Sequence, residues 1–214
     1  MFSKLKRKLK KKLILNNSRH IKRFGLIGTK IESDGSDVFE NCTFECNGEN
    51  NVIKLCGGVN LTNSNIFISG SGNVISIGKG SYISGATFWI EQDGNSIIIG
   101  DHLSANSDDN FTCIGGHKLT IGKDCLFSTQ INFQVGDGHT IFDAEGKIIN
   151  ETEDISIGDH VWIGKRATIL KGVRIMNDCI VGAGAILTKQ FDETNCIIAG
   201  VPAKIVKKGV GWKK

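Results

Sequence analysis

The chain has 214 residues, of which 40% are hydrophobic and 22% charged, enough for one domain with a buried core. It contains 27 glycines and one proline, so bends are expected mainly at glycine and asparagine. No run of about 18 apolar residues is present, which excludes a predicted transmembrane helix. The seven cysteines lack C-x-x-C spacing, which excludes a disulfide framework and a cysteine zinc finger. They predict reduced thiols in a cytoplasmic protein.

The N-terminal segment differs in charge from the rest of the chain. Residues 1–24 hold ten Lys and Arg residues and no acid, whereas residues 25–214 hold 16 basic and 22 acidic residues. The apolar positions at residues 2, 5, 9 and 13 predict a basic amphipathic helix over 1–24. Such a helix suits peripheral contact with the anionic inner face of a cell membrane, or a solubilising role at the edge of an oligomer. No motif favours nucleic-acid binding, and the charged start does not predict a secretory signal.

A repeat with a period of 22 residues runs through the first half of the chain. Four similar segments begin at Asn51, Asn73, Asn95 and His117, and each alternates apolar with polar residues. Alternation of this kind is typical of a short strand with one face turned inward. Because turn residues follow each segment, we expect short strands joined by tight corners. At His117, which replaces the asparagine of the repeat, we expect a corner role.

A shorter period of six follows. Large aliphatic residues recur at every sixth position, at Ile157, Ile163, Ile169, Ile175, Val181 and Leu187. Small or β-branched residues lie four positions after each of the first five, at Val161, Ala167, Val173, Cys179 and Ala185. Three such units close a triangular coil of 18 residues, and stacked coils bury one aliphatic column.

The two periods together predict an all-β solenoid, a parallel β-helix over residues 25–190. An excursion loop interrupts it at 135–154, and residues 191–214 form a C-terminal cap. The hexads resemble those of the hexapeptide-repeat acetyltransferases, and this resemblance implies a left-handed β-helix. A period of 22 also suits a right-handed β-helix, which stays open as an alternative.

The excursion contains a histidine between small, turn-forming residues. Loops of about 20 residues in compact domains are usually functional or disordered, and imidazole suits general-base work near neutral pH. We therefore expect His139 to be catalytic, with Asp137, Asp143 or Glu145 as the group that orients its ring. His160, in contrast, is expected to be structural or to face the substrate.

Two segments point to a particular group of enzymes within this family. Asp137-Gly138-His139-Thr140 and Gly158-Asp159-His160-Val161-Trp162-Ile163-Gly164 are similar to motifs of enzymes that O-acetylate bacterial capsular or lipopolysaccharide sugars, including sialic acid. The resemblance implies that His139 removes a proton from a sugar hydroxyl, which attacks the thioester of acetyl-CoA directly. It also implies that Trp162 lines the active site, although a place in a trimer interface is the alternative.

The coenzyme would bind farther along the chain. Gly182, Ala183, Gly184 and Ala185 offer an edge with little side-chain bulk, which permits close approach of the pantetheine arm. Gly200, Pro202, Ala203 and Lys204 resemble the family's C-terminal G-x-P-A-[KR] signature, which implies contact with the adenosine end. Further candidates for phosphate contact are Lys189, Lys207 and Lys208. Trp212 is expected to stack on adenine or to cover the last coil.

The resemblance further implies a homotrimer with each active site between neighbouring chains. Outward aromatic residues, expected at Phe88, Trp89 and Phe133, would need such cover. No metal is expected, since the five histidines lack the close pair typical of the γ-type carbonic anhydrases on the same fold. An N-acetyltransferase acting on an amino-sugar nucleotide, a xenobiotic acetyltransferase and a non-catalytic carbohydrate-binding solenoid remain alternatives.

Overall fold

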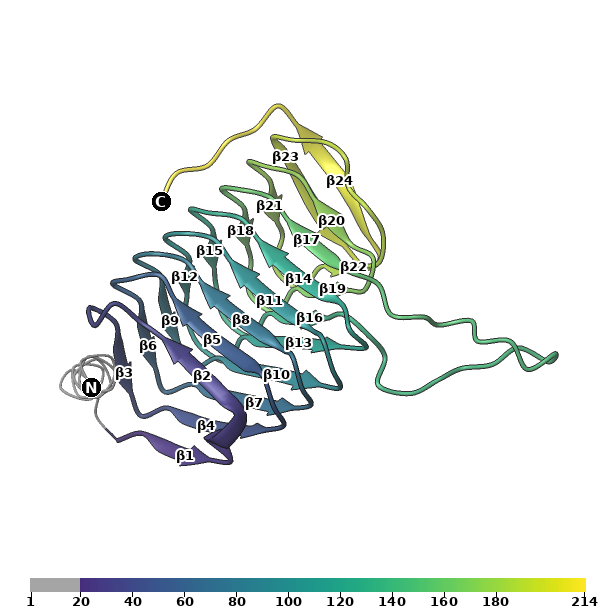
Figure 1. Cartoon of the computed structure of the whole chain (residues 1–214). Coiled ribbons are helices and arrows are strands. Elements are labelled where there is room, and N and C mark those ends of the chain that lie inside the picture. Colours follow the sequence, from purple (N-terminus) through teal and green to yellow (C-terminus); the bar gives the residue numbers. More distant parts are fainter. Residues whose placement is uncertain (1–19) are drawn as a thin grey trace, which may run out of the picture.

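The computed structural model describes residues 20–214, which form a three-sided stack of β coils with a long arm projecting from one corner (Figure 1). Three parallel sheets make the sides, and successive strands of the chain pass from one sheet to the next. One short 3-10 helix, η1 (Leu26–Gly28), lies in the first coil. The predicted all-β solenoid is confirmed.

We name the sheets A, B and C. Sheet A has nine strands, β3 (Val38–Glu40), β6 (Asn60–Thr62), β9 (Tyr82–Ser84), β12 (Ser104–Ala105), β15 (Leu126–Phe127), β18 (Trp162–Ile163), β21 (Ile180–Val181), β23 (Cys196–Gly200) and β24 (Ala203–Lys208). Sheet B has eight, β1 (Lys22–Phe24), β4 (Thr43–Asn47), β7 (Asn65–Ser69), β10 (Thr87–Glu91), β13 (Asn110–Ile114), β16 (Asn132–Gln134), β19 (Thr168–Leu170) and β22 (Ile186–Leu187). Sheet C has seven, β2 (Thr29–Glu32), β5 (Asn51–Leu55), β8 (Val74–Ile77), β11 (Ser96–Ile99), β14 (Lys118–Ile121), β17 (Ile155–Ile157) and β20 (Arg174–Ile175).

The strand register reproduces the two periods of the sequence. In sheet C, Val52 pairs with Val74, Val74 with Ser96, and Ser96 with Lys118, each one coil of 22 residues apart. Beyond the arm the step shortens to 18 residues, as in the pairing of Ile157 with Ile175. The shorter coils are those of the hexads, which need no extra residues at their corners.

The interior is a continuous apolar column. All eleven aliphatic, small and cysteine positions of the hexads are buried, from Ile157 through Leu187. Farther toward the N-terminus, the rings of Phe88, Phe111 and Phe133 stack on one another, with centroid separations of 4.9 Å and 5.3 Å. Since stacked aromatic pairs add to the free energy gained by burial, these rings stabilise neighbouring coils against each other.

Backbones approach closely where the chain turns from sheet C to sheet A. A Cβ added at Gly122 would lie 2.5 Å from the carbonyl carbon of Gly158 in the next coil. Only glycine fits such a spacing, because the obstructing atom is backbone and cannot rotate away. An asparagine ladder lies at the corner between sheets B and C. The side chains of Asn51 and Asn73 each accept a hydrogen bond from the backbone N–H of the asparagine in the next coil.

Two sequence-based expectations need correction. Residues 1–19 of the predicted basic helix lie outside the described residues, and Lys22–Phe24 form strand β1, which pairs with β4. Phe88 and Phe133 are fully buried rather than outward. Side chains alternate along a strand, so burial of Phe88 turns Trp89 outward, where it stacks on Phe67 with ring centroids 4.2 Å apart.

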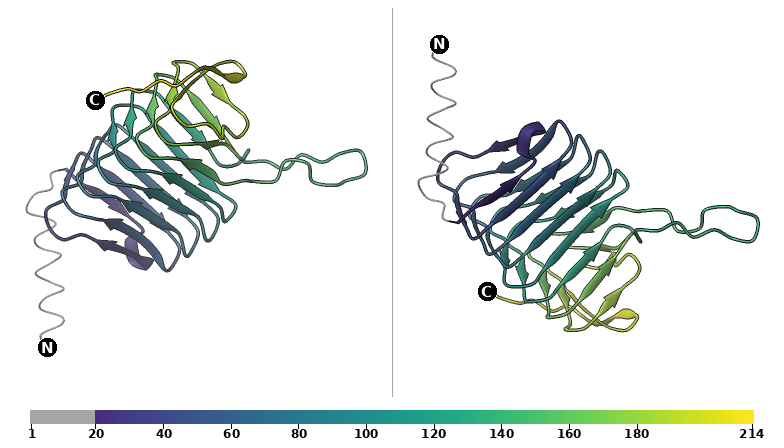
Figure 2. Two further views of the ribbon diagram at one scale, coloured as in Figure 1. Left: turned by 90° about the horizontal axis from the view of Figure 1, so that it is seen from above. Right: turned by 90° about the horizontal axis from the view of Figure 1, so that it is seen from below.

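The arm and the C-terminal segment are the two departures from the coils. The chain leaves sheet B after Gln134 and joins sheet C at Ile155 (Figures 1 and 2). The arm closes on itself through one antiparallel bridge between Phe142 and Ile148. At the other end of the stack, β24 turns back antiparallel to β23. Within residues 20–214, no helix has the length and hydrophobicity to cross a lipid bilayer.

Candidate active site

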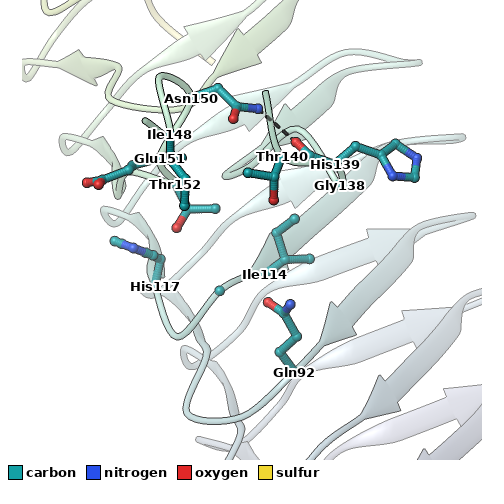
Figure 3. A pocket seen from close by; sticks show the side chains of 11 residues that line it. Gln92, Ile114, His117, Gly138, His139, Thr140, Ile148, Asn150, Glu151 and Thr152 are labelled. Carbon is teal, nitrogen blue, oxygen red and sulfur yellow. Dashed lines mark hydrogen bonds between the residues drawn. The ribbon is translucent and has the colours of Figure 1, made fainter. Parts of the chain in front are cut away.

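His139 lies near the root of the arm with its side chain exposed to solvent. Among the described residues its ring has no hydrogen-bond partner. In Figure 3 the ring points away from the other side chains around it. The residue is held through its backbone instead, since its carbonyl accepts a hydrogen bond of 2.8 Å from Asn150 Nδ2. Both ring nitrogens are therefore unpaired within the described residues.

None of the three carboxylates expected to orient His139 contacts its ring. Asp137 accepts hydrogen bonds from Lys171 Nζ at 2.6 Å and from Asn150 Nδ2 at 2.9 Å. The bond from Lys171 lowers the pKa of Asp137 below its usual value, so this carboxylate stays charged. Asp143 accepts two backbone N–H groups at the tip of the arm, and the Glu145 side chain has no partner among residues 20–214.

Three other histidines differ from His139 because each ring is paired with an aspartate. The Nδ1 atoms of His102, His117 and His160 lie 3.1, 2.8 and 2.9 Å from carboxylate oxygens of Asp124, Asp154 and Asp178 respectively. All three lie at corners of the coils. As expected, His117 occupies a corner at the position that follows Asn95 in the ladder.

Trp162 lies outward on β18 of sheet A with 39% of its surface exposed. Nearby, the ring of Trp212 stacks on the imidazole of His160 with centroids 4.2 Å apart, and its Nε1 donates to the His160 carbonyl. Trp212 therefore covers the corner between sheets C and A, within 6.2 Å of the Trp162 ring. The arm leaves from the corner between sheets B and C, so a single chain does not bring His139 and Trp162 together.

The predicted coenzyme residues fall into two groups. Gly182–Ala185 and the Gly200–Ala203 turn lie one coil apart, where Gly182 N–H donates to Ile198 at 2.8 Å. Ala183, Gly184 and Pro202 are exposed, whereas Ala185 and Ala203 are buried and can offer only backbone atoms to a ligand. Lys204 and Lys207 are exposed on β24. Lys189 lies apart from them, with its ammonium 5.9 Å from the centre of the Phe191 ring.

A cavity of about 370 Å³ opens beneath the root of the arm. The close-up in Figure 3 shows Thr140 and Thr152 pointing into the same space from the two branches of the arm. Gln92 and His117 reach it from the coils below. The cavity therefore combines hydroxyl and amide groups with the apolar side chains of Ile114 and Ile148.

Two buried cysteines near the middle of the stack are poor nucleophiles. Burial raises the pKa of Cys125 to about 11 and that of Cys113 to about 12, so both thiols stay protonated near neutral pH. Residues 20–214 contain no group of three His, Cys, Asp or Glu side chains that could hold a metal ion.

Sequence reasoning did not single out Asn150 or Lys171, which hold the arm at its root. A polar residue is common in an exposed loop, as at Asn150, and at a coil corner, as at Lys171, so neither position is distinctive in the sequence. Only the return of the arm toward its own start, which brings Asn150 beside Asp137, gives them a role.

Comparison with known proteins gives a consistent assignment. Residues 154–189 match the family model "Bacterial transferase hexapeptide (six repeats)". Polysialic acid O-acetyltransferases from Escherichia coli O1:K1 and Neisseria meningitidis are 35% and 36% identical over 96 and 92 residues, or 44% and 42% of this chain. These matches span only 31% and 43% of the length of those curated relatives.

A solved structure extends the similarity to the whole fold. The crystallographically analysed polysialic acid O-acetyltransferase OatWY is 31% identical, with a TM-score of 0.85 over 92% of this chain and 91% of that chain. The match gives the coils a left-handed sense, so the right-handed alternative is wrong. The chain belongs to the hexapeptide-repeat acetyltransferases, a family of left-handed parallel β-helices.

Proposed function

We propose that this protein is an acetyl-CoA-dependent O-acetyltransferase that modifies a hydroxyl of a bacterial cell-surface polysaccharide sugar, with sialic acid as the first acceptor to test. The observation that carries the proposal is the contrast among the histidines. The rings of His102, His117 and His160 are paired with aspartates, whereas that of His139 is exposed and unpaired within residues 20–214. The similarity to polysialic acid O-acetyltransferases supports the choice of acceptor.

In the proposed reaction, His139 acts as the general base. It accepts the proton of the sugar hydroxyl as the oxygen attacks the thioester carbonyl of acetyl-CoA. The carbon–sulfur bond breaks, the acetyl group becomes a sugar ester, and the proton passes from the imidazolium to the departing CoA sulfur. A positioned base contributes about 10²–10⁴-fold to turnover.

Assembly as a homotrimer would complete the site. His139 lies on the arm, at the corner between sheets B and C, whereas Trp162 lies on sheet A. The arm of one protomer would therefore reach the coenzyme strip of its neighbour, formed by residues 182–185 and 200–204. Exposed apolar side chains on the arm, Ile141, Phe142, Ile148 and Ile149, support this arrangement because a neighbouring chain would cover them. The close approach possible at Ala183 and Gly184 suits the pantetheine arm, and Lys204 suits a phosphate. Peripheral membrane contact through residues 1–24 remains a proposal.

The experiment is an acceptor screen with labelled acetyl-CoA, polysialic acid, neutral capsular polymers and amino-sugar nucleotides. An O-acetyl product is released by mild alkali, whereas the product of the alternative N-acetyltransferase survives. His139→Ala should lower turnover by about 10² or more without loss of folding or CoA binding. His102→Ala, at a coil corner, is the matched control and should retain turnover. Unchanged turnover in His139→Ala would rule out His139 as the base, whereas absence of transfer to every acceptor by the wild type would favour the non-catalytic solenoid.

A further inference from the structure

One carboxamide at the root of the arm contacts the chain on both sides of His139. Asn150 Nδ2 donates to Asp137 Oδ2 at 2.9 Å and to the His139 carbonyl at 2.8 Å. Its Oδ1 accepts the backbone N–H of Ile141 at 2.6 Å. The three contacts therefore bracket His139 at alternate positions along the outgoing branch of the arm.

The outgoing branch has little else to hold it. Gly138 adopts a φ of 76°, and a Cβ built there would meet nothing within 4 Å, so the backbone before His139 runs through open space. The arm has only one bridge, farther toward its tip, between Phe142 and Ile148. Since the His139 ring has no partner of its own within residues 20–214, its placement depends on the backbone contacts made by Asn150.

A lysine fixes this carboxamide network to the coils. Lys171 follows β19 in the next coil and is largely buried, with 20% of its side chain exposed. Its Nζ donates to Asp137 Oδ2 at 2.6 Å and to the Asn150 carbonyl at 2.9 Å. Both branches of the arm are thereby tied to one corner of the solenoid.

We propose that Asn150 is a positioning residue for His139, holding the base at a fixed distance from the coil stack through the Asp137, His139 and Ile141 contacts. The inference rests on the proposed role of His139. A shift of about 1 Å at a catalytic group costs on the order of 10²-fold in rate, so loss of this carboxamide should act on turnover. It should leave the fold intact, because Asn150 lies outside the buried column.

The test compares substitutions at Asn150 in the full-length protein, with polysialic acid and acetyl-CoA as the first probes. Asn150→Ala should lower kcat about 10- to 100-fold, with unchanged KM for acetyl-CoA and unchanged Tm. Asn150→Asp should be at least as impaired, because it loses both donated bonds and places a second carboxylate beside Asp137. Asn150→Gln keeps donor and acceptor and should recover part of the turnover. Glu145→Ala, at the arm tip, is the matched control and should behave as the wild type.

Two further measurements separate positioning from a general structural role. The midpoint of the pH dependence of kcat/KM should stay at the wild-type value in Asn150→Ala while its height falls, because His139 remains the base. Amide exchange at Ile141 should accelerate in Asn150→Ala and stay slow in Glu145→Ala. This readout needs no acceptor.

The outcomes are distinguishable. If His139→Ala is inactive while Asn150→Ala keeps full kcat, the positioning role is overturned and the proposed function stands. If both variants keep full turnover, the proposed role of His139 as the base fails, and the positioning role of Asn150 fails with it. If the wild type transfers acetyl to none of the acceptors, the proposed function itself fails. A fall in Tm together with a rise in KM for acetyl-CoA in Asn150→Ala would show a merely structural role and also overturn the inference.

Discussion

The coil stack and the arm differ in how their apolar side chains are buried and in how their strands are paired. In the coils, apolar side chains face a sealed column, and each strand pairs with strands of adjacent coils. In the arm, four large apolar side chains are exposed, and the two branches are joined by one β-bridge and by the contacts of Asn150. The difference separates two properties, because stability resides in the coils whereas the proposed chemistry depends on the arm. Substitutions of exposed arm residues should therefore leave the stability of the coils almost unchanged, whereas substitutions in the buried column should lower it.

The sharpest contrast compares one phenylalanine from each region. Phe111 is fully buried between Phe88 and Phe133, whereas Phe142 is 57% exposed on the arm. Phe111→Ala should lower the free energy of unfolding by about 3–5 kcal/mol, because it leaves a cavity in the column. Phe142→Ala should change the free energy of unfolding of a single chain by less than about 0.5 kcal/mol, because most of its ring is exposed within its own chain. Urea unfolding of both variants measures the difference in free energy of unfolding. Equal losses of stability in the two variants would contradict the distinction between coils and arm.

Backbone spacing offers a second contrast, of smaller size. Gly122→Ala would press a methyl group against the Gly158 backbone, so coils must separate locally, at a cost of about 1–3 kcal/mol. Gly211→Ala adds the same group where no atom lies within 4 Å. Thermal unfolding should show a lower Tm only for Gly122→Ala. A wild-type Tm in that variant would mean that the stack can adjust freely at its corners.

A third test concerns a charge within the coils. Asp109 is buried, and Oδ2 has no hydrogen-bond partner within residues 20–214. Burial raises its pKa from 3.8 to about 7. An acid with a raised folded-state pKa binds more protons folded than unfolded, so stability falls as pH rises through the window from 3.8 to about 7. From pH 5 to pH 7 this loss should be about 2 kcal/mol.

Asp109→Asn removes the titration while keeping an oxygen that can accept the Ile131 N–H. Its stability should therefore change less between pH 5 and pH 7 than that of the wild type, whatever its absolute value. Glu145→Ala, which removes an exposed carboxylate from the arm, should keep the wild-type slope. If the free energy of unfolding changes equally with pH in Asp109→Asn and in the wild type, Asp109 is not the group that causes the pH dependence.

The hexads could be predicted from sequence because a period of six leaves few alternatives. Positions from Ile157 to Leu187 are buried as expected, since each must fill the same column. Two aromatic residues expected on the outside, Phe88 and Phe133, are buried instead. In Thr87–Glu91 the alternation of the strand places Phe88 inside and Trp89 outside, and this parity overrides side-chain size.

The candidate site was less predictable. The position of His139 in a long excursion singled it out, but no local pattern could show that Asp137 would pair with Lys171, which lies 34 residues away. Similarly, Trp162 on sheet A and His139 on the arm are close in sequence yet lie apart, because the chain passes along sheet C between them. Contacts between coils depend on register, which a single segment does not contain.

The regular register of sheet C has a practical consequence for protein engineering. Val52 and Val74 occupy equivalent places in consecutive turns. Excision of residues 52–73 would join Asn51 directly to Val74. It would restore a strand of sheet C, its corner and the asparagine ladder. The solenoid can thus be shortened by a whole repeat while the arm, the coenzyme strip and their mutual orientation remain as they are, which makes molecular length an adjustable dimension of this protein.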